Sequence, residues 1–516
     1  MLAKVPRWSF FFLSMVLGCF GGLWSDDADQ RPPNMVFILL DDLGYGDVQC
    51  LNPQRGKIKT PCMDRLAREG MVFTDAHTSS SVCSPSRYSL LTGRYAWRTE
   101  LQKGVLFGHD TAMIRPEIMT VPGLLKSKGY STAFIGKWHV GWDWTYIDEK
   151  RTQIDFTKPV TNGPSTRGFD YSYGQIASLD IPPYVYVEND KPTAVPDRIV
   201  AESKGLAYWR KGDIAPDFKH EEVLTNFVNR GIAYIEKQSK TSQPFFLYLP
   251  LPAPHTPILP SQEFKGKSSI GPYGDFVMMV DAEIGRIDKA LEMAGIAKDT
   301  LLIITSDNGC SKAADIAAMN NAGHYPSAQF RGSKSDIWDG GHRVPFIVRW
   351  PKLVTAGSSC HQLICLTDFM ATCAEITRTT LPKNAGVDSV SFMSALKGKD
   401  SKDRERIGVV HHSINGNFAF RKGPWKLELT PGSGGWSQPM DAQALQHGLP
   451  DVQLYNMELD EGETKNLQAE FPEVVDQMKK ELKGLIAQGR SNEGPIDKND
   501  VEHIDMWKKG ASTKKK

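Results

Sequence analysis

Neither sign of charge is in excess in this sequence, which removes the simplest argument for a polyanionic partner. Its 516 residues contain 61 Lys and Arg against 60 Asp and Glu. Proteins that bind nucleic acid or an anionic membrane through their overall field carry a clear basic excess. We therefore expect no nucleic acid as a partner, and any attraction for an anionic substrate must be local.

Long apolar runs are also scarce. After the first 25 residues, no segment offers the roughly 18 uninterrupted apolar residues of a membrane span. The one long run, Trp8 to Leu23, follows Lys4 and Arg7 and precedes Ser25, a pattern typical of a secretory signal peptide. We predict a signal peptide over residues 1–25, an exported protein (periplasmic or secreted), and no transmembrane segment in the mature chain.

Cysteine is sparse and follows no zinc-binding spacing. The eight cysteines stand at positions 19, 50, 62, 83, 310, 360, 365 and 373. Cys19 follows Val16-Leu17-Gly18, a poor match to a lipoprotein site, so lipid anchoring is the disfavoured alternative. The six cysteines other than Cys19 and Cys83 could form disulfides in an exported protein or remain core thiols.

The chain alternates apolar runs with amphipathic stretches, which predicts a doubly wound α/β sheet. The predicted buried strands are 35–40, 131–135, 244–249 and 300–305, and helices are expected over 120–128, 221–237 and 277–293. Each strand runs into polar residues, and in open α/β sheets the ligand crevice lies at the carboxyl ends of the strands. We therefore expect Asp41, Asp42, Lys137 with His139, His255, Asp307 and Asn308 to converge.

A change of pattern after about residue 375 predicts a smaller C-terminal α+β subdomain. Short strands are expected over 407–411, 417–421 and 425–429, and a last helix over 472–487. We divide the chain into a catalytic domain over 32–375, a C-terminal subdomain over 376–505 and a basic tail over 506–516.

The pentapeptide Cys83-Ser84-Pro85-Ser86-Arg87 is the most informative motif. Ser84 is expected to cap a helix that Gly93 ends, so residue 83 would lie where free N–H groups favour an anion. A buried structural cysteine is the alternative interpretation. Together with Leu91-Thr92-Gly93-Arg94, the motif resembles the maturation signature of the type I, arylsulfatase A-like sulfatases.

That resemblance implies an alkaline-phosphatase-like fold and a cysteine oxidised to formylglycine (3-oxoalanine) by a maturation enzyme. One hydroxyl of the hydrated aldehyde would attack sulfur and expel the alcohol, and the other would then release inorganic sulfate. It also implies that Arg87 meets the metal-ligand carboxylates and the formylglycine loop.

Oxygen donors dominate the predicted metal site. Asp41, Asp42, Asp307 and Asn308 supply carboxylate and amide oxygens, which suit Ca²⁺ or Mg²⁺ better than softer ions. The resemblance favours one Ca²⁺ ion, lying against residue 83. A solvated strand end or helix cap is the alternative for Asp41-Asp42 taken alone.

Three further blocks resemble family motifs. Gly136-Lys137-Trp138-His139-Val140-Gly141 implies that Lys137 binds sulfate and that His139 accepts a proton, and Lys and His two apart should point the same way along a strand. Pro254-His255-Thr256-Pro257 implies that His255 protonates the leaving alcohol. Arg331-Gly332-Ser333-Lys334 implies a second sulfate-binding lysine, Lys334, although Asp339 stands where the family has glutamate.

Weaker signals surround these blocks. Ser178 is the position aligned with a serine close to the sulfate, and an ordinary turn serine is the alternative. His324, Tyr325 and His342 flank the Lys334 loop and could contact substrate. The aromatic set at 138, 142, 144 and 146 could stack on sugars or pack in the core.

The sequence therefore predicts a calcium-dependent sulfuric ester hydrolase acting on a sulfated sugar or polysaccharide. The alternatives are a phosphate or phosphonate monoester hydrolase of the same superfamily, and a non-catalytic exported glycan-binding homologue. The sugar, the sulfate position, exo or endo action, the oligomeric state and the maturation system are not determined by the sequence.

Overall fold

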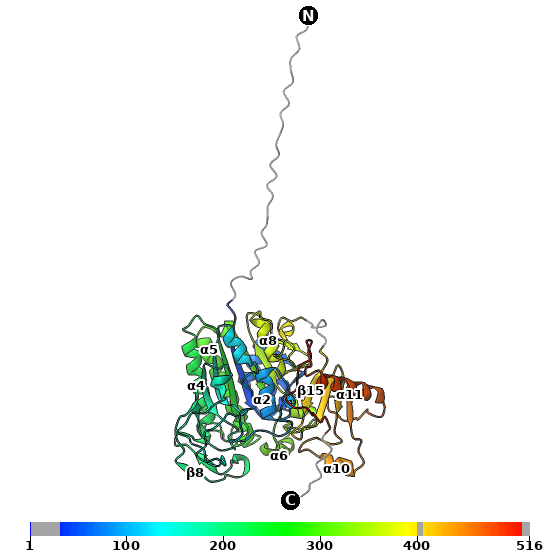
Figure 1. Cartoon of the computed structure of the whole chain (residues 1–516), viewed down its shortest axis with the longest axis horizontal. Coiled ribbons are helices and arrows are strands. Elements are labelled where there is room, and N and C mark those ends of the chain that lie inside the picture. Colours follow the sequence, from blue (N-terminus) through cyan, green and yellow to red (C-terminus); the bar gives the residue numbers. More distant parts are fainter. Residues whose placement is uncertain (2–30, 400–405, 508–516) are drawn as a thin grey trace. The chain divides into compact units, whose positions relative to one another are not determined.

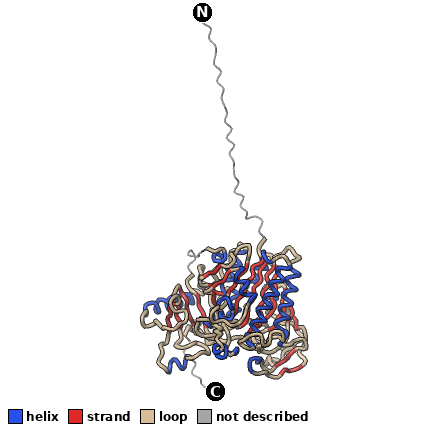
Figure 2. The backbone as a smooth tube through the Cα atoms, turned by 180° about the vertical axis from the view of Figure 1, so that it is seen from behind, coloured by secondary structure: helices blue, strands red, loops and turns tan. Residues whose placement is uncertain are grey.

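A mixed β-sheet of ten strands is the framework of the fold (Figures 1 and 2). The computed structural model describes Met1, residues 31–399 and residues 406–507. In spatial order the sheet contains β13 (Ser358–Cys360), β2 (Met71–Phe73), β12 (Phe346–Arg349), β11 (Thr300–Ser306), β1 (Asn34–Asp41), β10 (Phe245–Pro254), β4 (Ser131–Lys137), β5 (Tyr171–Gln175), β6 (Val187–Glu188) and β7 (Lys191–Pro192).

The four predicted buried strands are the centre of this sheet. β11, β1, β10 and β4 are neighbours and run parallel to one another, whereas β12 runs antiparallel to β11. The prediction of an α/β fold with a doubly wound mixed sheet is confirmed, and all four strands extend one to five residues beyond the predicted ends.

Helices cover both faces of the sheet because side chains alternate along its central strands. Val36, Ile38 and Leu40 of β1 pack in one core with α1 (Pro61–Glu69), α4 (Val223–Gln238) and α5 (Pro272–Met293). Met35, Phe37 and Leu39 pack in the opposite core with α2 (Cys83–Thr92), α3 (Val121–Ser127) and α8 (Phe369–Ile376). The helices predicted over 120–128, 221–237 and 277–293 correspond to α3, α4 and α5.

The remaining elements are short. They are β3 (Ala76–His77) paired with β14 (Ile364–Cys365), β8 (Arg198–Val200) paired with β9 (Gly212–Ile214), and helices α6 (Ile316–Asn321), α7 (Asp339–His342), α9 (Met393–Leu396) and α10 (Asp441–Gln446).

A separate antiparallel sheet forms in the C-terminal part. Its order is β15 (Val409–His412), β16 (Phe418–Lys422), β17 (Trp425–Glu428) and β18 (Gln453–Asn456), and α11 (Pro472–Ala487) packs beside it (Figure 1). The three predicted strands and the last helix are present, which agrees with the predicted α+β subdomain. β18 was not predicted as a strand. The boundary at residue 375 stays a prediction.

Main-chain hydrogen bonds join this small sheet to loops of the main sheet. The His412 amide donates to the Ser79 carbonyl at 3.1 Å, and the Ser81 amide donates to the His412 carbonyl at 3.1 Å. The Ile414 amide donates to the Ser335 carbonyl at 3.1 Å. The C-terminal strands therefore brace the segment before Cys83 and the segment after Lys334.

The predictions for the two ends of the chain are not tested by the structure. The predicted signal peptide, including Cys19, and residues 508–516 of the predicted basic tail lie outside the described residues. Within the described ranges, no helix combines the length and the apolar character that crossing a membrane requires.

Candidate active site

The carboxyl ends of β11, β1, β10 and β4 bring the predicted residues together. Asp41 ends β1 and Lys137 ends β4, while His255 directly follows β10 and Asp307 directly follows β11. The Asp42 amide donates to Asp307 Oδ1 at 3.3 Å, and Asn308 Nδ2 donates to Asp42 Oδ1 at 2.7 Å. The four strand ends therefore meet, as the sequence predicts.

Helix α2 delivers Cys83 and Arg87 to the same place. Cys83 is 2% exposed, and its sulfur, one Asp41 oxygen and one Asp307 oxygen lie within 4.8 Å of one another. The Arg87 guanidinium binds Asp307 Oδ2 through Nη2 at 2.7 Å and through Nε at 2.9 Å. Its Nη1 donates to the Lys137 carbonyl at 2.9 Å. The arginine meets the carboxylates, as the sequence predicts.

The expected cap of α2 is wrong, however. The helix begins at Cys83, with Val82 as the residue before it, so Ser84 lies inside the first turn. The Ser84 hydroxyl instead accepts from the Leu106 amide at 3.0 Å, which ties the helix to a loop. The end is as predicted, because Gly93 adopts φ +63°, a left-handed conformation that glycine favours.

Three cations balance the three carboxylates of this cluster. Lys137 Nζ lies 2.6 Å from Asp41 Oδ2, and Lys334 Nζ lies 2.7 Å from Asp42 Oδ1. Arg87 forms the salt bridge with Asp307 that is described above. Since all these side chains are nearly or fully buried, their charges interact through a medium of low polarizability and little screening.

The cluster has oxygen atoms that no protein group satisfies. Asp41 Oδ1, Asp42 Oδ2 and Asn308 Oδ1 are buried and accept no hydrogen bond from the described residues. Buried polar atoms without a partner are rare and call for an explanation. These three oxygens, with those of Asp307, form a hard donor set that fits a divalent cation such as Ca²⁺ or Mg²⁺.

Burial and charge set the protonation of the central groups. Burial raises the pKa of the Cys83 thiol to about 11, against the opposing effect of Lys137 and Lys334. Burial also acts to raise the pKa of Asp41, but Lys137, His255, Arg87 and Lys334 outweigh it and hold that pKa well below its ordinary value. At neutral pH, Asp41 is therefore ionised and the encoded thiol is protonated.

His139 lies beside the cluster in an unexpected backbone conformation. Strand β4 ends at Lys137 and His139 has φ +57°, so the alternation expected of two strand residues does not apply. Its Nε2 pairs with the Leu106 carbonyl at 2.8 Å, while its buried Nδ1 has no partner among the described residues. Burial lowers the pKa of His139, and Lys137 and Arg87 lower it further, so the ring is neutral.

His255 lies at the edge of the cluster. Its side chain is 11% exposed, and its Nε2 lies 3.7 Å from Asp42 Oδ2. Its Nδ1 lies 2.5 Å from the Thr256 carbonyl, which fixes the ring and leaves Nε2 directed at Asp42. A proton on Nδ1 donated to that carbonyl makes Nε2 the atom available for exchange with a substrate.

Ser178 lies in the loop after β5 and is not hydrogen-bonded through its hydroxyl to any described residue of the cluster. It is 3% exposed, and its carbonyl accepts from the Ile181 amide at 3.0 Å. Its predicted role stays a prediction.

Most of the weaker sequence signals are buried residues, whereas Tyr146 and Tyr325 are half-buried. Trp138, Trp142 and Trp144 are buried and Tyr146 is half-buried, which favours core packing over sugar stacking. His324 is fully buried with Nε2 2.8 Å from Asp47. The described cysteines at 50, 62, 83, 310, 365 and 373 are free thiols, so the disulfide alternative is not realised among these six.

The sequence did not predict two buried clusters that contain Asp339 and His342. Lys426 Nζ binds Asp339 Oδ1 at 2.8 Å, Glu463 Oε1 at 2.5 Å and Glu428 Oε1 at 3.1 Å. The aspartate that departs from the family pattern therefore shares Lys426 with two glutamates of the C-terminal part, and its amide donates to Glu463 Oε2 at 2.8 Å. In the second cluster, His342 stacks on His411 with ring centroids 3.9 Å apart, so His342 is a core residue.

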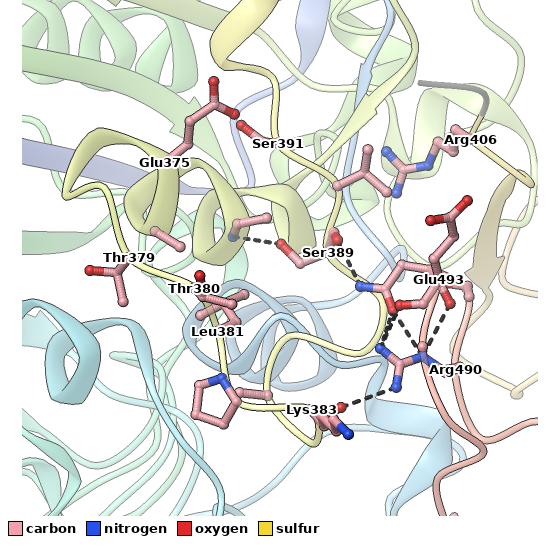
Figure 3. Close-up of a pocket in the computed structure, with 18 of the residues that line it drawn as sticks. Glu375, Thr379, Thr380, Leu381, Lys383, Ser389, Ser391, Arg406, Arg490 and Glu493 are labelled. Carbon is pink, nitrogen blue, oxygen red and sulfur yellow. Dashed lines mark hydrogen bonds between the residues drawn. The ribbon is translucent and has the colours of Figure 1, made fainter. Parts of the chain in front are cut away.

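A large surface hollow elsewhere shares no residue with the cluster. It lies between α8 and the segment 490–495, with Glu375, Lys383 and Glu493 in its lining (Figure 3). Arg490 in its wall already donates to the Lys383 and Pro495 carbonyls at 3.0 and 2.9 Å. We therefore place the candidate active site at the converging strand ends and not in this hollow.

Comparison with known proteins agrees with this geometry. The profile of the Sulfatase family matches residues 33–379. An N-acetylgalactosamine-6-O-sulfatase of Bacteroides thetaiotaomicron is 30% identical over 518 residues, covering 92% of this chain and 97% of that protein. Arylsulfatase A of Homo sapiens is 31% identical over 494 residues, covering 92% of this chain and 91% of that protein.

Solved structures share the fold. One from the metabolism of multiple glycosaminoglycans by Bacteroides thetaiotaomicron has a TM-score of 0.76 at 30% identity, covering 88% of this chain and 99% of that chain. The PsFucS1 sulfatase from Pseudoalteromonas sp. has a TM-score of 0.68 at 23% identity, covering 90% of this chain and 92% of that chain. The protein therefore belongs to the sulfatase family and is a sulfuric ester hydrolase.

Proposed function

We propose that this hydrolase releases inorganic sulfate from sulfated sugars or polysaccharides, with a formylglycine made from Cys83 and one bound Ca²⁺ ion. The observation that carries the proposal is the meeting of Cys83 and Arg87 with three carboxylates and two lysines at the carboxyl edge of four parallel strands. The net reaction consumes one water for each ester and yields the alcohol, sulfate and a proton.

The calcium ion would be held by Asp41, Asp42, Asp307 and Asn308. Support comes from their three unsatisfied buried oxygens, because such atoms are costly unless an ion or water completes them. When bound, the ion polarises a sulfate oxygen, and the hydrated formylglycine supplies the nucleophile. Arg87 would fix the positions of Asp307 and of α2, because its guanidinium donates both to the Asp307 carboxylate and to the Lys137 carbonyl at the end of β4.

The two lysines would bind the sulfate group. Lys137 ends β4 and Lys334 lies in the loop before α7, and their ammonium groups contact different aspartates of the cluster. A bound cation would neutralise those aspartates and leave the lysine charges for the ester. Preorganised cations in a buried site stabilise developing negative charge without having to reorient.

The two histidines would move protons in opposite directions. His255 would protonate the leaving alcohol oxygen through Nε2, since its Nδ1 is fixed on the Thr256 carbonyl. His139 would accept a proton at Nδ1, because donation from Nε2 to the Leu106 carbonyl leaves Nδ1 as the basic nitrogen and the ring is neutral. Ser178 is retained in this proposal as a sulfate contact on its position in the sequence alone.

The cellular context is also proposed. The amino-terminal pattern favours a signal peptide over residues 1–25 and export, without lipid anchoring, and the formylglycine requires a maturation enzyme as partner. We propose the catalytic domain over 32–375, the C-terminal subdomain over 376–505 and the basic tail over 506–516. The names of the relatives favour 6-sulfated N-acetylgalactosamine as the first saccharide to test.

The decisive experiment is sulfate release from defined sulfated saccharides by protein made with a formylglycine-generating enzyme. A 4-nitrophenyl sulfate arm reports sulfatase chemistry without a sugar, and 4-nitrophenyl phosphate is the matched control. Faster phosphate hydrolysis would reject the sulfatase assignment in favour of a phosphate monoester hydrolase. An unmodified Cys83 in active protein would reject the formylglycine, which makes the peptide about 18 Da lighter than the thiol form.

A further inference from the structure

A glycine-rich loop of the C-terminal part lies against the loops that carry the proposed sulfate and metal ligands. The loop spans residues 432–437, between β17 and α10. The Ile337 amide donates to the Ser433 carbonyl at 2.7 Å, and the Trp436 amide donates to Ser335 Oγ at 3.1 Å. Lys312 Nζ, on the loop that follows Asn308, lies 2.5 Å from the Trp436 carbonyl. Trp436 is therefore anchored between the Asn308 loop and the Lys334 loop.

Asp336 and a close backbone approach fix this loop. The buried Asp336 carboxylate accepts from the Trp436 and Ser437 amides, both at 2.9 Å, and from the Ser333 amide at 2.9 Å. A Cβ atom at Gly435 would lie 2.3 Å from the Ser335 carbonyl oxygen, a distance at which backbone atoms would have to move. Only glycine fits at position 435 with this backbone, so Gly435 allows the loop to pack directly against the segment that follows Lys334.

The side chain on this anchored backbone, Trp436, is unusually exposed for a tryptophan of this protein. Trp436 is 42% exposed, and of the tryptophans in the described ranges it alone is exposed. An exposed indole on an anchored main chain offers a large apolar face, and its few rotatable bonds keep the entropic cost of ordering it low. Binding sites for small molecules typically combine such aromatic faces with a few charged groups.

We propose that Trp436 is a specificity-determining residue whose indole stacks on a sugar ring on the alcohol side of the sulfate ester. The proposal rests on the proposed function, because the sulfate group has to sit between Lys137 and Lys334 for a ring to extend over this loop. The C-terminal part then supplies substrate recognition, while the main sheet supplies the chemistry.

The test compares Trp436→Ala and Trp436→Phe with the parent protein, all made with a maturation enzyme. The probe is a chondroitin 6-sulfate disaccharide, and inhibition by inorganic sulfate reports the anion pocket alone. We expect Trp436→Ala to raise KM for the disaccharide about tenfold, which is about 1.4 kcal/mol. We expect kcat and the inhibition constant for sulfate to change less than about twofold, and Trp436→Phe to restore most of the loss because the aromatic face is retained.

Leu445→Ala is the matched control, because Leu445 lies on α10 of the same subdomain and is 47% exposed. It should leave all three constants unchanged. An unchanged KM in Trp436→Ala, or an equal rise in the sulfate inhibition constant, overturns the inference. Failure of the parent to hydrolyse even 4-nitrophenyl sulfate would instead overturn the proposed function. Hydrolysis of that ester but not of the disaccharide would reject the saccharide class, and the role of Trp436 with it.

Discussion

Replacing Lys334 by alanine tests the sulfate-binding arrangement most directly. The ammonium group is 2.7 Å from Asp42 Oδ1 on a side chain that is 7% exposed, so it acts in a nearly dry site. Attraction between unit charges about 4 Å apart is about 4 kcal/mol at an effective dielectric constant of about 20. Removal of one preorganised donor from an anion-stabilising site typically lowers the rate 10²–10³-fold. We therefore expect kcat/KM to fall roughly 10²–10³-fold.

The assay is steady-state hydrolysis of 4-nitrophenyl sulfate, with thermal unfolding measured on the same samples. Lys334→Arg keeps the charge and should recover part of the rate, whereas Lys128→Ala, at an exposed position after α3, should change nothing. Because the site is buried, the loss should vary little with ionic strength. A loss below about tenfold in a protein that unfolds at the parent temperature would refute a direct role of this lysine at the sulfate.

Three further perturbations test the remaining chemistry and the framework. Cys83→Ala should reduce sulfate release to background with nearly unchanged thermal unfolding, and residual turnover would count against the formylglycine. Dialysis against a chelator should lower both activity and the unfolding temperature, and added Ca²⁺ should restore them, since a ligand at about 100 times its Kd stabilises the folded state by about 2.7 kcal/mol. Equal activity with and without chelator would contradict the calcium proposal. Lys426→Met removes the lysine that three buried carboxylates share and leaves Arg343 as the cation beside Asp339 alone. It should destabilise the fold by about 3–5 kcal/mol in urea unfolding, whereas the exposed Lys422→Met should not.

The acid stability of the fold gives a further prediction. Burial tends to raise the pKa of Asp75, but His77, Arg343 and Arg421 outweigh it and lower that pKa below its ordinary value. The stabilisation is therefore complete above an unfolded-state pKa of about 3.9 and is lost as the pH falls through the folded-state value. We expect Asp75→Asn to be less stable at pH 7 and to lose less stability on acidification. An identical acid profile in the parent and the variant would contradict this assignment.

Much of the site could be predicted because its residues stand at the ends of strong strands. Asp41 and Asp307 are 266 positions apart in the chain, yet each closes a buried apolar run, and parallel strands bring their carboxyl ends to one edge. The alternation of β1 side chains between two cores follows from the same pattern. Periodicity thus fixes the sheet and, through it, the position of the carboxylates.

What could not be predicted depends on contacts that leave no local pattern. Asp339 contacts Lys426 and, through its amide, Glu463, and no local pattern predicts that these distant segments meet. Ser84 resembles a cap, but its hydroxyl accepts a hydrogen bond from the Leu106 amide in a distant loop. The helix begins at Cys83, so Ser84 lies inside its first turn. The left-handed conformation of His139 could not be predicted either, because residues other than glycine rarely adopt it, although histidine is among those enriched there.

The burial of helix α2 has a consequence for how active molecules are made. All ten of its residues, from Cys83 to Thr92, are inaccessible in the folded protein. If Cys83 is converted to formylglycine as proposed, the oxidising enzyme would have to reach it before α2 packs into the core that it shares with α8. The proportion of active enzyme would then depend on whether that enzyme acts before the new chain folds. Treatment of the folded protein would raise this proportion only after unfolding it.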